Sequence, residues 1–210
     1  MWRTTPIHRS EERGSWPEDA PPRLPDHLVD EQTQRLKDGA GPLFHRRYIA
    51  QIRDPRVSPE ELMARVQRDP DCAAPTEFAT FKKAAGDGDR MRPGDEYVVR
   101  MPGPWDGPVR VVEATQRSFR LMTLEGHLEA GQIVFRANGG GERMEFEIES
   151  WARGGDRLSN LLYHRLRMSK EVQLHMWTSF LERVIRLSGG TREGGLRIQT
   201  RRVEEVPVAD

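Results

Sequence analysis

Hydrophobic and polar positions alternate most clearly over residues 143–151, where Met144, Phe146 and Ile148 are separated by glutamates. Because successive side chains of a strand point to opposite faces, this segment predicts an antiparallel sheet with one dry face and one face in water. The same period of two, interrupted by glycine and proline, predicts further strands at 44–52, 96–101, 109–115, 118–123 and 132–137.

Helical patterns surround these strands. Ser58, Pro59 and Glu61 match the N-cap, first turn and capping glutamate of a helix that follows the first strand. Residues 76–85 predict a second short helix, because Phe78 and Phe81 lie three positions apart.

A third helix is predicted over residues 156–187, with an apolar stripe that includes Val172, Met176, Phe180 and Val184. At 1.5 Å per residue it is about 45–50 Å long, enough to cross a domain about 40 Å wide. We therefore expect an α+β protein in which a curved antiparallel sheet wraps around a long C-terminal helix. This order of elements is the START-like helix-grip architecture, and by analogy it favours a binding cavity.

Both ends of the chain are polar and rich in proline, glycine or charge. Residues 1–40 predict a mostly mobile N-terminal extension, with a short helix allowed at 26–37. Residues 189–210 predict a solvated C-terminal tail, although the alternation at 196–203 also permits an edge strand. The helix-grip domain is thus expected at 41–188.

Charge and cysteine content narrow the classes of function. Lysine plus arginine equals aspartate plus glutamate, 33 of each, so no overall positive field attracts nucleic acid. Cys72 is the one cysteine, and no Cys/His spacing resembles a zinc site, so we expect no metal and no cofactor. No apolar run is long enough to span a bilayer, and we expect a cytoplasmic protein.

The segment 123–131, Thr-Leu-Glu-Gly-His-Leu-Glu-Ala-Gly, carries a family resemblance. It resembles the Thr-Leu-x-Gly-His-x-Glu-x-Gly signature of the uncharacterised domain-of-unknown-function family 1990. Further similar features are the Val-Arg-Val-Val run at 109–112, Phe135, and the Trp-Ala-Arg step at 151–153. The resemblance implies membership over about residues 43–188, and it implies no established activity.

Our leading functional hypothesis is a non-catalytic module that binds a small hydrophobic molecule between sheet and helix. Polar groups that orient the ligand are expected from Thr123, His127 and Glu129. The expected apolar lining is Val99, Val111, Phe119, Leu121, Phe135, Met144, Phe146, Ile148, Met176 and Phe180.

Two alternatives remain open. His127 and Glu129 are two residues apart, so in an extended segment they share a face and are weak catalytic candidates for a cyclase or lyase. The other interpretation of this pair is that both side chains fix a glycine-bounded turn. The second alternative is an adaptor that recruits a protein partner through its tails, with a core filled by side chains.

Overall fold

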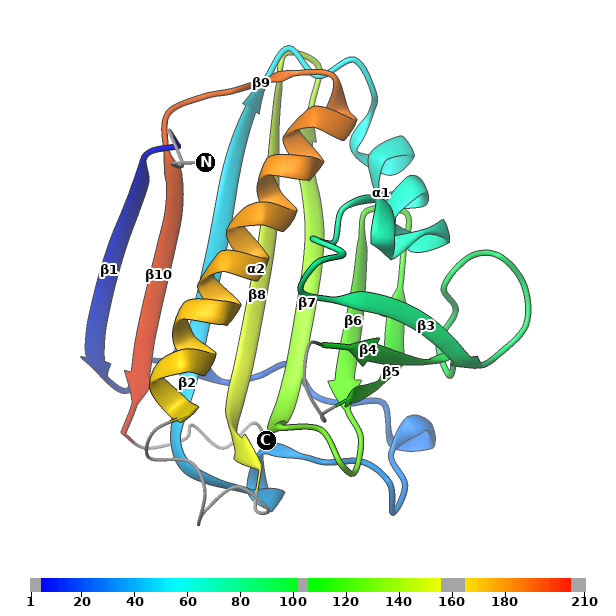
Figure 1. The fold of residues 1–210 in the computed structure, drawn as a ribbon, viewed down its shortest axis with the longest axis vertical. Coiled ribbons are helices and arrows are strands. Elements are labelled where there is room, and N and C mark those ends of the chain that lie inside the picture. The colour runs from blue at the N-terminus through cyan, green and yellow to red at the C-terminus, as the bar shows by residue number, and fades with distance from the viewer. Residues whose placement is uncertain (1–4, 102–105, 156–164, 205–210) are drawn as a thin grey trace.

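The computed structural model describes residues 5–101, 106–155 and 165–204 and has a large curved sheet with one long helix packed across it (Figure 1). The strands are β1 (Ile7–Gly14), β2 (Gly39–Arg53), β3 (Thr80–Ala85), β4 (Glu96–Arg100), β5 (Asp106–Ala114), β6 (Ser118–Thr123), β7 (Glu129–Gly140), β8 (Arg143–Gly155), β9 (Thr191–Arg192) and β10 (Leu196–Val203). The α-helices are α1 (Pro59–Arg68) and α2 (Arg165–Ser188), and single-turn 3-10 helices occur at Pro17–Asp19, Asp26–Leu28, Leu36–Asp38 and Pro70–Cys72.

The strands of the described chain form one ten-stranded sheet in the order β1-β10-β2-β8-β7-β6-β5-β4-β3, with β9 paired to β2. Only the β1–β10 pair among these is parallel, and the others are antiparallel. We call the face that carries α2 the helix face and the opposite face the outer face. All six predicted strands lie within or overlap observed strands.

The helix face holds the main core. Register places Tyr48, Ile148, Phe135 and Phe119 side by side across four strands, and all four side chains are buried. Burial of such a row against α2 removes apolar surface from water, which is the main favourable term in folding. The alternation in β8 therefore predicted the helix face correctly.

The outer face differs from the prediction, because it is not simply in water. Glu147 and Glu149 of β8 are only 4% and 9% exposed. Arginines of neighbouring strands, among them Arg47 and Arg136, pair with these carboxylates and cover them. The alternation identified the polar face but not the ion pairs that bury it.

The prediction of a helix at residues 76–85 is wrong, since Thr80–Ala85 is strand β3. Phe81 pairs with Val99 of β4, and its backbone N–H donates to the Asp71 carboxylate at 2.7 Å. Hydrogen bonds from the Phe78 and Ala79 N–H groups to the Pro75 carbonyl close a single turn, but Phe81 already lies in β3, so the two phenylalanines do not share a helix. Pairing with an existing sheet edge overrides so short a periodic signal.

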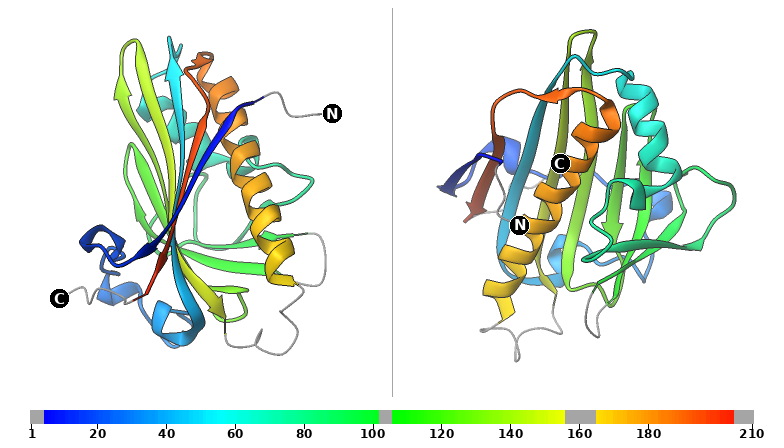
Figure 2. Two further views of the ribbon diagram at one scale, coloured as in Figure 1. Left: turned by 90° about the vertical axis from the view of Figure 1, so that its left-hand side faces the viewer. Right: turned by 45° about the horizontal axis from the view of Figure 1, so that its top comes forward.

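The prediction that residues 1–40 are mostly mobile is wrong for the described part. Strand β1 joins the sheet, and residues 15–38, which we call the N-terminal strap, lie across the outer face (Figure 2). Asp19 of the strap is fully buried, and Leu24 and Leu28 pack on an apolar cluster of the outer face. The helix allowed at 26–37 is absent there, and two single-turn 3-10 helices occupy parts of that segment.

Residues 189–204 also differ from the predicted solvated tail. Strand β10 lies between β1 and β2, and its Leu196 and Ile198 are buried on the helix face. Strands from all three predicted segments thus belong to one sheet, so the boundaries at 40 and 188 do not separate structural units. Alternate residues in β10 bury enough apolar surface to offset the charge between them.

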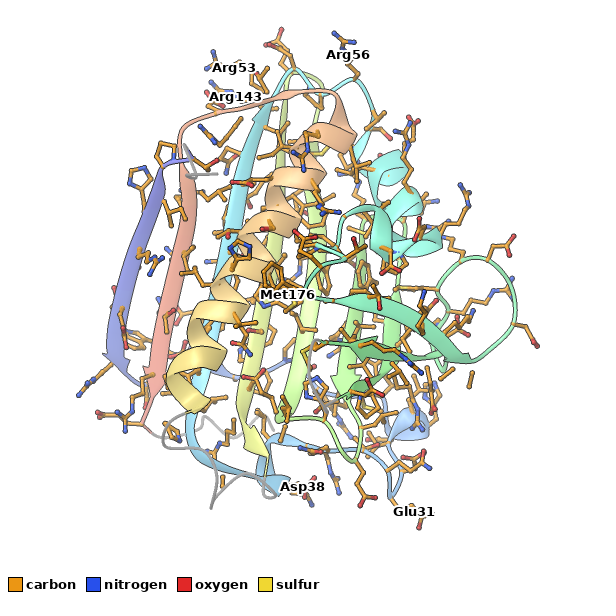
Figure 3. All side chains as sticks on the ribbon, in the orientation of Figure 1. Glu31, Asp38, Arg53, Arg56, Arg143 and Met176 are labelled. Carbon is orange, nitrogen blue, oxygen red and sulfur yellow. The ribbon has the colours of Figure 1, made fainter. Side chains whose placement is uncertain are left out.

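Helix α2 confirms the expected C-terminal helix over Arg165–Ser188, while residues 156–164 of that prediction lie outside the described part. Met176 (labelled in Figure 3), Phe180 and Val184 are buried against the sheet. Val172 was assigned to the same stripe but is 38% exposed. Among residues 172–188, whose side chains are described, the apolar stripe contacts the sheet from Met176 onward.

Candidate functional site

The predicted apolar lining residues differ in how deeply they are buried. Eight of them are at most 2% exposed and belong to one core cluster: Val111, Phe119, Leu121, Phe135, Met144, Phe146, Ile148 and Phe180. Met176 is 8% exposed, and Val99 is partly exposed at the border of the cluster.

Aromatic contacts fill the space between α2 and the middle of the sheet. The rings of Phe119 and Phe135 are stacked with centroids 4.5 Å apart, and Phe180 of α2 lies 5.4 Å from Phe135. Phe180 also lies 6.1 Å from Phe146 and 6.2 Å from Trp177. A ligand can reach these side chains only if α2 moves, because each already contacts protein atoms.

Beside this packed region the helix face carries small side chains. Ser150 and Ala152 of β8 and Gly131 of β7 occupy adjacent register positions, one and two rows from the phenylalanines. Glycine is required at 131, because a Cβ there would lie 2.0 Å from the carbonyl oxygen of Trp151. We call these three residues the small-residue strip.

A group of polar residues that sequence reasoning missed borders the strip. Arg46 of β2 lies opposite Ser150, is 7% exposed, and donates to Gln173 of α2 at 3.3 Å. Its guanidinium is 4.0 Å from the Glu129 carboxylate. Burial raises the pKa of the neighbouring Tyr48 to about 12, with opposing charge effects from Arg46 and Glu129, so its hydroxyl keeps its proton.

His45, Arg46 and Arg47 are consecutive basic residues, but they do not form one solvated cluster, because His45 and Arg46 are buried. In a strand they alternate, so Arg46 points to the helix face while His45 and Arg47 point to the outer face. The signal that could have separated them is their parity with Tyr48, Ala50 and Ile52, which mark the helix face in the same strand.

Thr123, at the start of the family element, fixes the end of β6. Its hydroxyl accepts from the Gly131 N–H at 2.9 Å and donates to the Gln34 carbonyl at 2.9 Å. Thr123 is 8% exposed, so its polar atoms are already used within the protein. It connects β6, β7 and the N-terminal strap.

His127 bonds to backbone as well. Its Nδ1 lies 2.9 Å from both the backbone nitrogen and the carbonyl oxygen of Glu129. Burial lowers the pKa of His127, which favours the neutral ring at pH 7. The ring also packs against Gly107, where a Cβ would come within 3.0 Å. This geometry is the turn-fixing arrangement that we weighed against catalysis.

A second polar network lies on the outer face. The buried His45 ring contacts Asp19 through Nδ1 at 2.7 Å and Glu149 through Nε2 at 2.8 Å, and it stacks on Trp151. Burial alone would raise the pKa of Glu149, but hydrogen bonds from His45 and Arg136 bring it below its ordinary value. The network joins the strap to the sheet, and Asp19 was not foreseen because its segment was predicted to be mobile.

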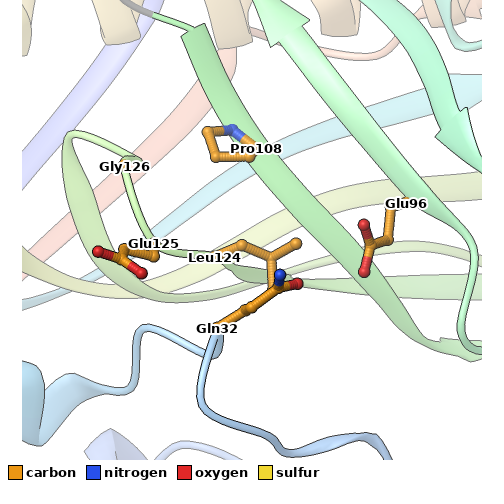
Figure 4. A pocket seen from close by; sticks show the side chains of 6 residues that line it. All are labelled: Gln32, Glu96, Pro108, Leu124, Glu125 and Gly126. Atoms are coloured by element: carbon orange, nitrogen blue, oxygen red, sulfur yellow. The ribbon is translucent and has the colours of Figure 1, made fainter.

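Two hollows of the described surface lie away from the predicted lining. One, of about 340 Å³, is bounded by the strap, β4, β5 and the family element, with Gln32, Glu96, Pro108, Leu124, Glu125 and Gly126 around it (Figure 4). The other, of about 260 Å³, is lined by Cys72, Arg183, Arg186 and Leu187. Burial and two aspartates raise the pKa of Cys72 to about 11, which keeps the thiol protonated.

In the described residues, no three histidine, cysteine, aspartate or glutamate side chains gather as a metal site. No helix in the same ranges has the length and apolarity for a membrane span.

In the described residues a large curved sheet packs against a long C-terminal helix, which defines an α+β protein. The model of one family matches residues 22–183, and the chain belongs to that family, described as a domain of unknown function (DUF1990). The family resemblance of residues 123–131 is thereby confirmed.

No curated protein is detectably similar to the chain in sequence. Similar solved structures include a conserved protein from Geobacillus kaustophilus, 11% identical, with a TM-score of 0.49 over 71% of this chain and 99% of that one. The hypothetical protein jhp0584 from Helicobacter pylori is 12% identical, with a TM-score of 0.46 over 79% and 95%. Norcoclaurine synthase from Thalictrum flavum, in complex with dopamine and hydroxybenzaldehyde, is 10% identical, with a TM-score of 0.45 over 73% and 89%.

Proposed function

We propose that the protein is a non-catalytic binding module for a small molecule with an apolar body and a polar end. The ligand lies on the helix face over the small-residue strip, Ser150, Ala152 and Gly131. The observation that carries the proposal is the difference in side-chain size along this face. Phenylalanines fill the space under α2 in the rows of Phe135 and Phe146, whereas Ser150 and Ala152 of β8 and Gly131 of β7 are small, and Ile133 is the one large side chain that β7 and β8 contribute to those two rows.

Apolar side chains that retain exposure support the same place. Ile133 and Val99 on the sheet and Leu174 and Trp177 on α2 are partly buried members of the core border. Partial exposure gives them free surface for an apolar ligand. The fully buried phenylalanines lie beside this surface. They make less contact with the ligand than the predicted lining implies.

In this proposal Arg46 and Tyr48, rather than His127 and Thr123, bind the polar end of the ligand. The Arg46 guanidinium has more donors than its described contacts with Gln173 and Glu129 use. The Tyr48 hydroxyl has no hydrogen bond among the described residues, and it stays a donor because its pKa is about 12. Together they favour a carboxylate, sulfonate or carbonyl group at the polar end.

The enzyme alternative receives less support. His127 interacts with the backbone of Glu129, while the Glu129 carboxylate lies near Arg46. A proton-transfer pair needs a side chain that can meet substrate with its proton free. The adaptor alternative loses its basis in mobile tails, because the described parts of both tails belong to the sheet or cover it.

Titration with 1-anilinonaphthalene-8-sulfonate, an apolar anion, tests the proposal. We expect saturable fluorescence enhancement with the native protein, and at least tenfold weaker binding with S150F, whose ring fills the strip. Q199F adds the same ring to an exposed position on the outer face and should bind the dye normally. Unfolding midpoints of both variants verify that they are folded.

Equal dye affinity in folded S150F and Q199F would refute binding at the strip. Absence of saturable binding by the native protein, together with no small molecule in native mass spectra of protein from its own host, would refute the binding function as a whole.

A further inference from the structure

Strand β1 is an edge of the sheet, and its side chains face water. It comes first in the strand order, and residues 8–13 between Ile7 and Gly14 are all exposed. Helix α2 lies over β2 and β8 and leaves this edge uncovered (Figures 1 and 2). An open strand edge of this length is a template for another strand.

The backbone directions of β1 follow from its pairing with β10. The Leu196 N–H donates to the Pro6 carbonyl, and the Glu204 N–H donates to the Gly14 carbonyl. In a strand, alternate residues direct their backbone groups to opposite edges, so even-numbered residues face β10. The N–H and C=O groups of Ile7, Arg9, Glu11 and Arg13 therefore point outward from the sheet.

These directions restrict how two copies can pair antiparallel about a twofold axis. Odd-numbered residues must lie opposite odd-numbered residues, because only they present outward hydrogen-bonding groups. Three central registers satisfy this condition, with the axis at Arg9, at Ser10 or at Glu11. In each of them the two helix faces lie on the same side of the joined sheet.

Charge selects one of the three registers. With the axis at Arg9, the Arg9 residues of the two copies lie opposite each other. With the axis at Glu11, the two Glu11 residues lie opposite each other, and Arg9 of each copy lies opposite Arg13 of the other. An axis at Ser10 sets Arg9 against Glu11 twice on the helix face and His8 against Glu12 twice on the outer face. Opposite charges directly across a strand pair are favourable and like charges are not.

We propose that β1 pairs antiparallel with β1 of a second copy of this chain, with the twofold axis at Ser10, so that the two sheets become continuous. The charge pattern of β1 complements itself in this register, which identifies a second copy as the partner. One strand pair buries less than the roughly 1,200–2,000 Å² of a standard interface, so the dimer is weak, on the order of 100 μM.

Sedimentation velocity between 10 μM and 1 mM tests the dimer. The native protein should shift from monomer to dimer across this range. R9E and E11R each place like charges opposite one another at both symmetric positions, and each should weaken association at least tenfold. The double variant R9E/E11R, and an equimolar mixture of the two single variants, restore opposite charges and should restore the dimer.

Disulfide trapping tests the register. In a non-hydrogen-bonded pair the facing Cα atoms are about 4.5 Å apart, within disulfide range, and Ser10 faces its own copy in such a pair. S10C should therefore form a covalent dimer under mild oxidation, whereas E12C, more than about 10 Å from its copy, should not. The native protein, which contains Cys72, controls for that thiol.

A native protein that stays monomeric at 1 mM overturns the proposal. So does a dimer that R9E leaves intact, or one that E12C traps as fast as S10C. None of these results bears on ligand binding, since the strip and β1 are separate surfaces.

Discussion

The hydroxyl of Thr123 connects three segments that are far apart in sequence. It bonds to the backbone of Gly131 and of Gln34, next to the Thr33–Leu124 bridge of the strap. The family element resembles a ligand-orienting loop in sequence, yet its threonine hydroxyl and the Nδ1 atom of its histidine bond to backbone. Residue type alone cannot distinguish these roles, because the same hydroxyl or imidazole serves both.

Replacement of Thr123 with valine should lower the free energy of unfolding by about 2 kcal/mol. Valine keeps the shape but leaves the Gly131 N–H and the Gln34 carbonyl without this partner, at a cost of about 1–3 kcal/mol. Urea denaturation measures the effect. Thr123→Ser keeps the hydroxyl and should lose less than half as much; equal losses for both variants would mean that packing, and not hydrogen bonding, is the role of Thr123.

The sequence was enough to predict which side of a strand is apolar. It was not enough to predict which polar side chains are buried and what they contact. Phe146 and Ile148 are recognisable as helix-face residues from alternation alone. Arg46, in contrast, can be buried because Gln173 of the distant α2 accepts a hydrogen bond from its guanidinium and the Glu129 carboxylate of β7 balances its charge. Such partners come from tertiary contacts, which leave no local pattern.

At the scale of elements, long periodic segments were predictable and short ones were not. The alternation of β8 and the stripe of α2 each repeat over several residues, and both elements are present. The segment 76–85 carried a single aromatic pair, and its strand conformation depends on the edge offered by β4. Strand β10 was underestimated because its burial depends on β1, at the other end of the chain.

Phe180→Ala should destabilise the protein by about 3–5 kcal/mol, because it removes the α2 ring that contacts Phe135 and Phe146. Chemical denaturation gives the value. Val172→Ala on the same helix is a matched control and should change stability by less than about 0.5 kcal/mol, since Val172 is exposed. A loss below 1 kcal/mol for Phe180→Ala would contradict the packing of α2 on the sheet.

At the scale of the whole molecule, the outer-face network links four parts of the chain. Asp19 of the strap, His45 of β2, Glu149 of β8 and Arg201 of β10 form it. The antiparallel strands from β4 to β8 and the C-terminal helix were predictable, but the strap across the outer face was not. Its carbonyls serve as acceptors for Arg120, a contact without a sequence signature.

This network predicts a pH dependence of stability. The folded pKa of Glu149 is below its ordinary value, so its ionised form stabilises the fold above about pH 4.5, and this contribution is lost as pH falls through the folded pKa. Glu149→Gln should therefore be less stable than the native protein at pH 7, by about 3 kcal/mol. The difference between the urea midpoints of the two proteins should shrink as pH falls from 7 to 3; a constant difference would exclude the charge of Glu149 as the cause.

Strand β1 pairs with β10, which lies near the other end of the described chain. The ribosome therefore makes β10 only after almost all the other described residues. Ile7 pairs with Leu196, so among the described strands β1, which is made before the others, waits for β10, which is made after them, before it acquires a place in the sheet. Closing so long a loop is entropically costly and slow. During synthesis the rest of the sheet can assemble from β2 onward, while the exposed, charged β1 waits in water for β10.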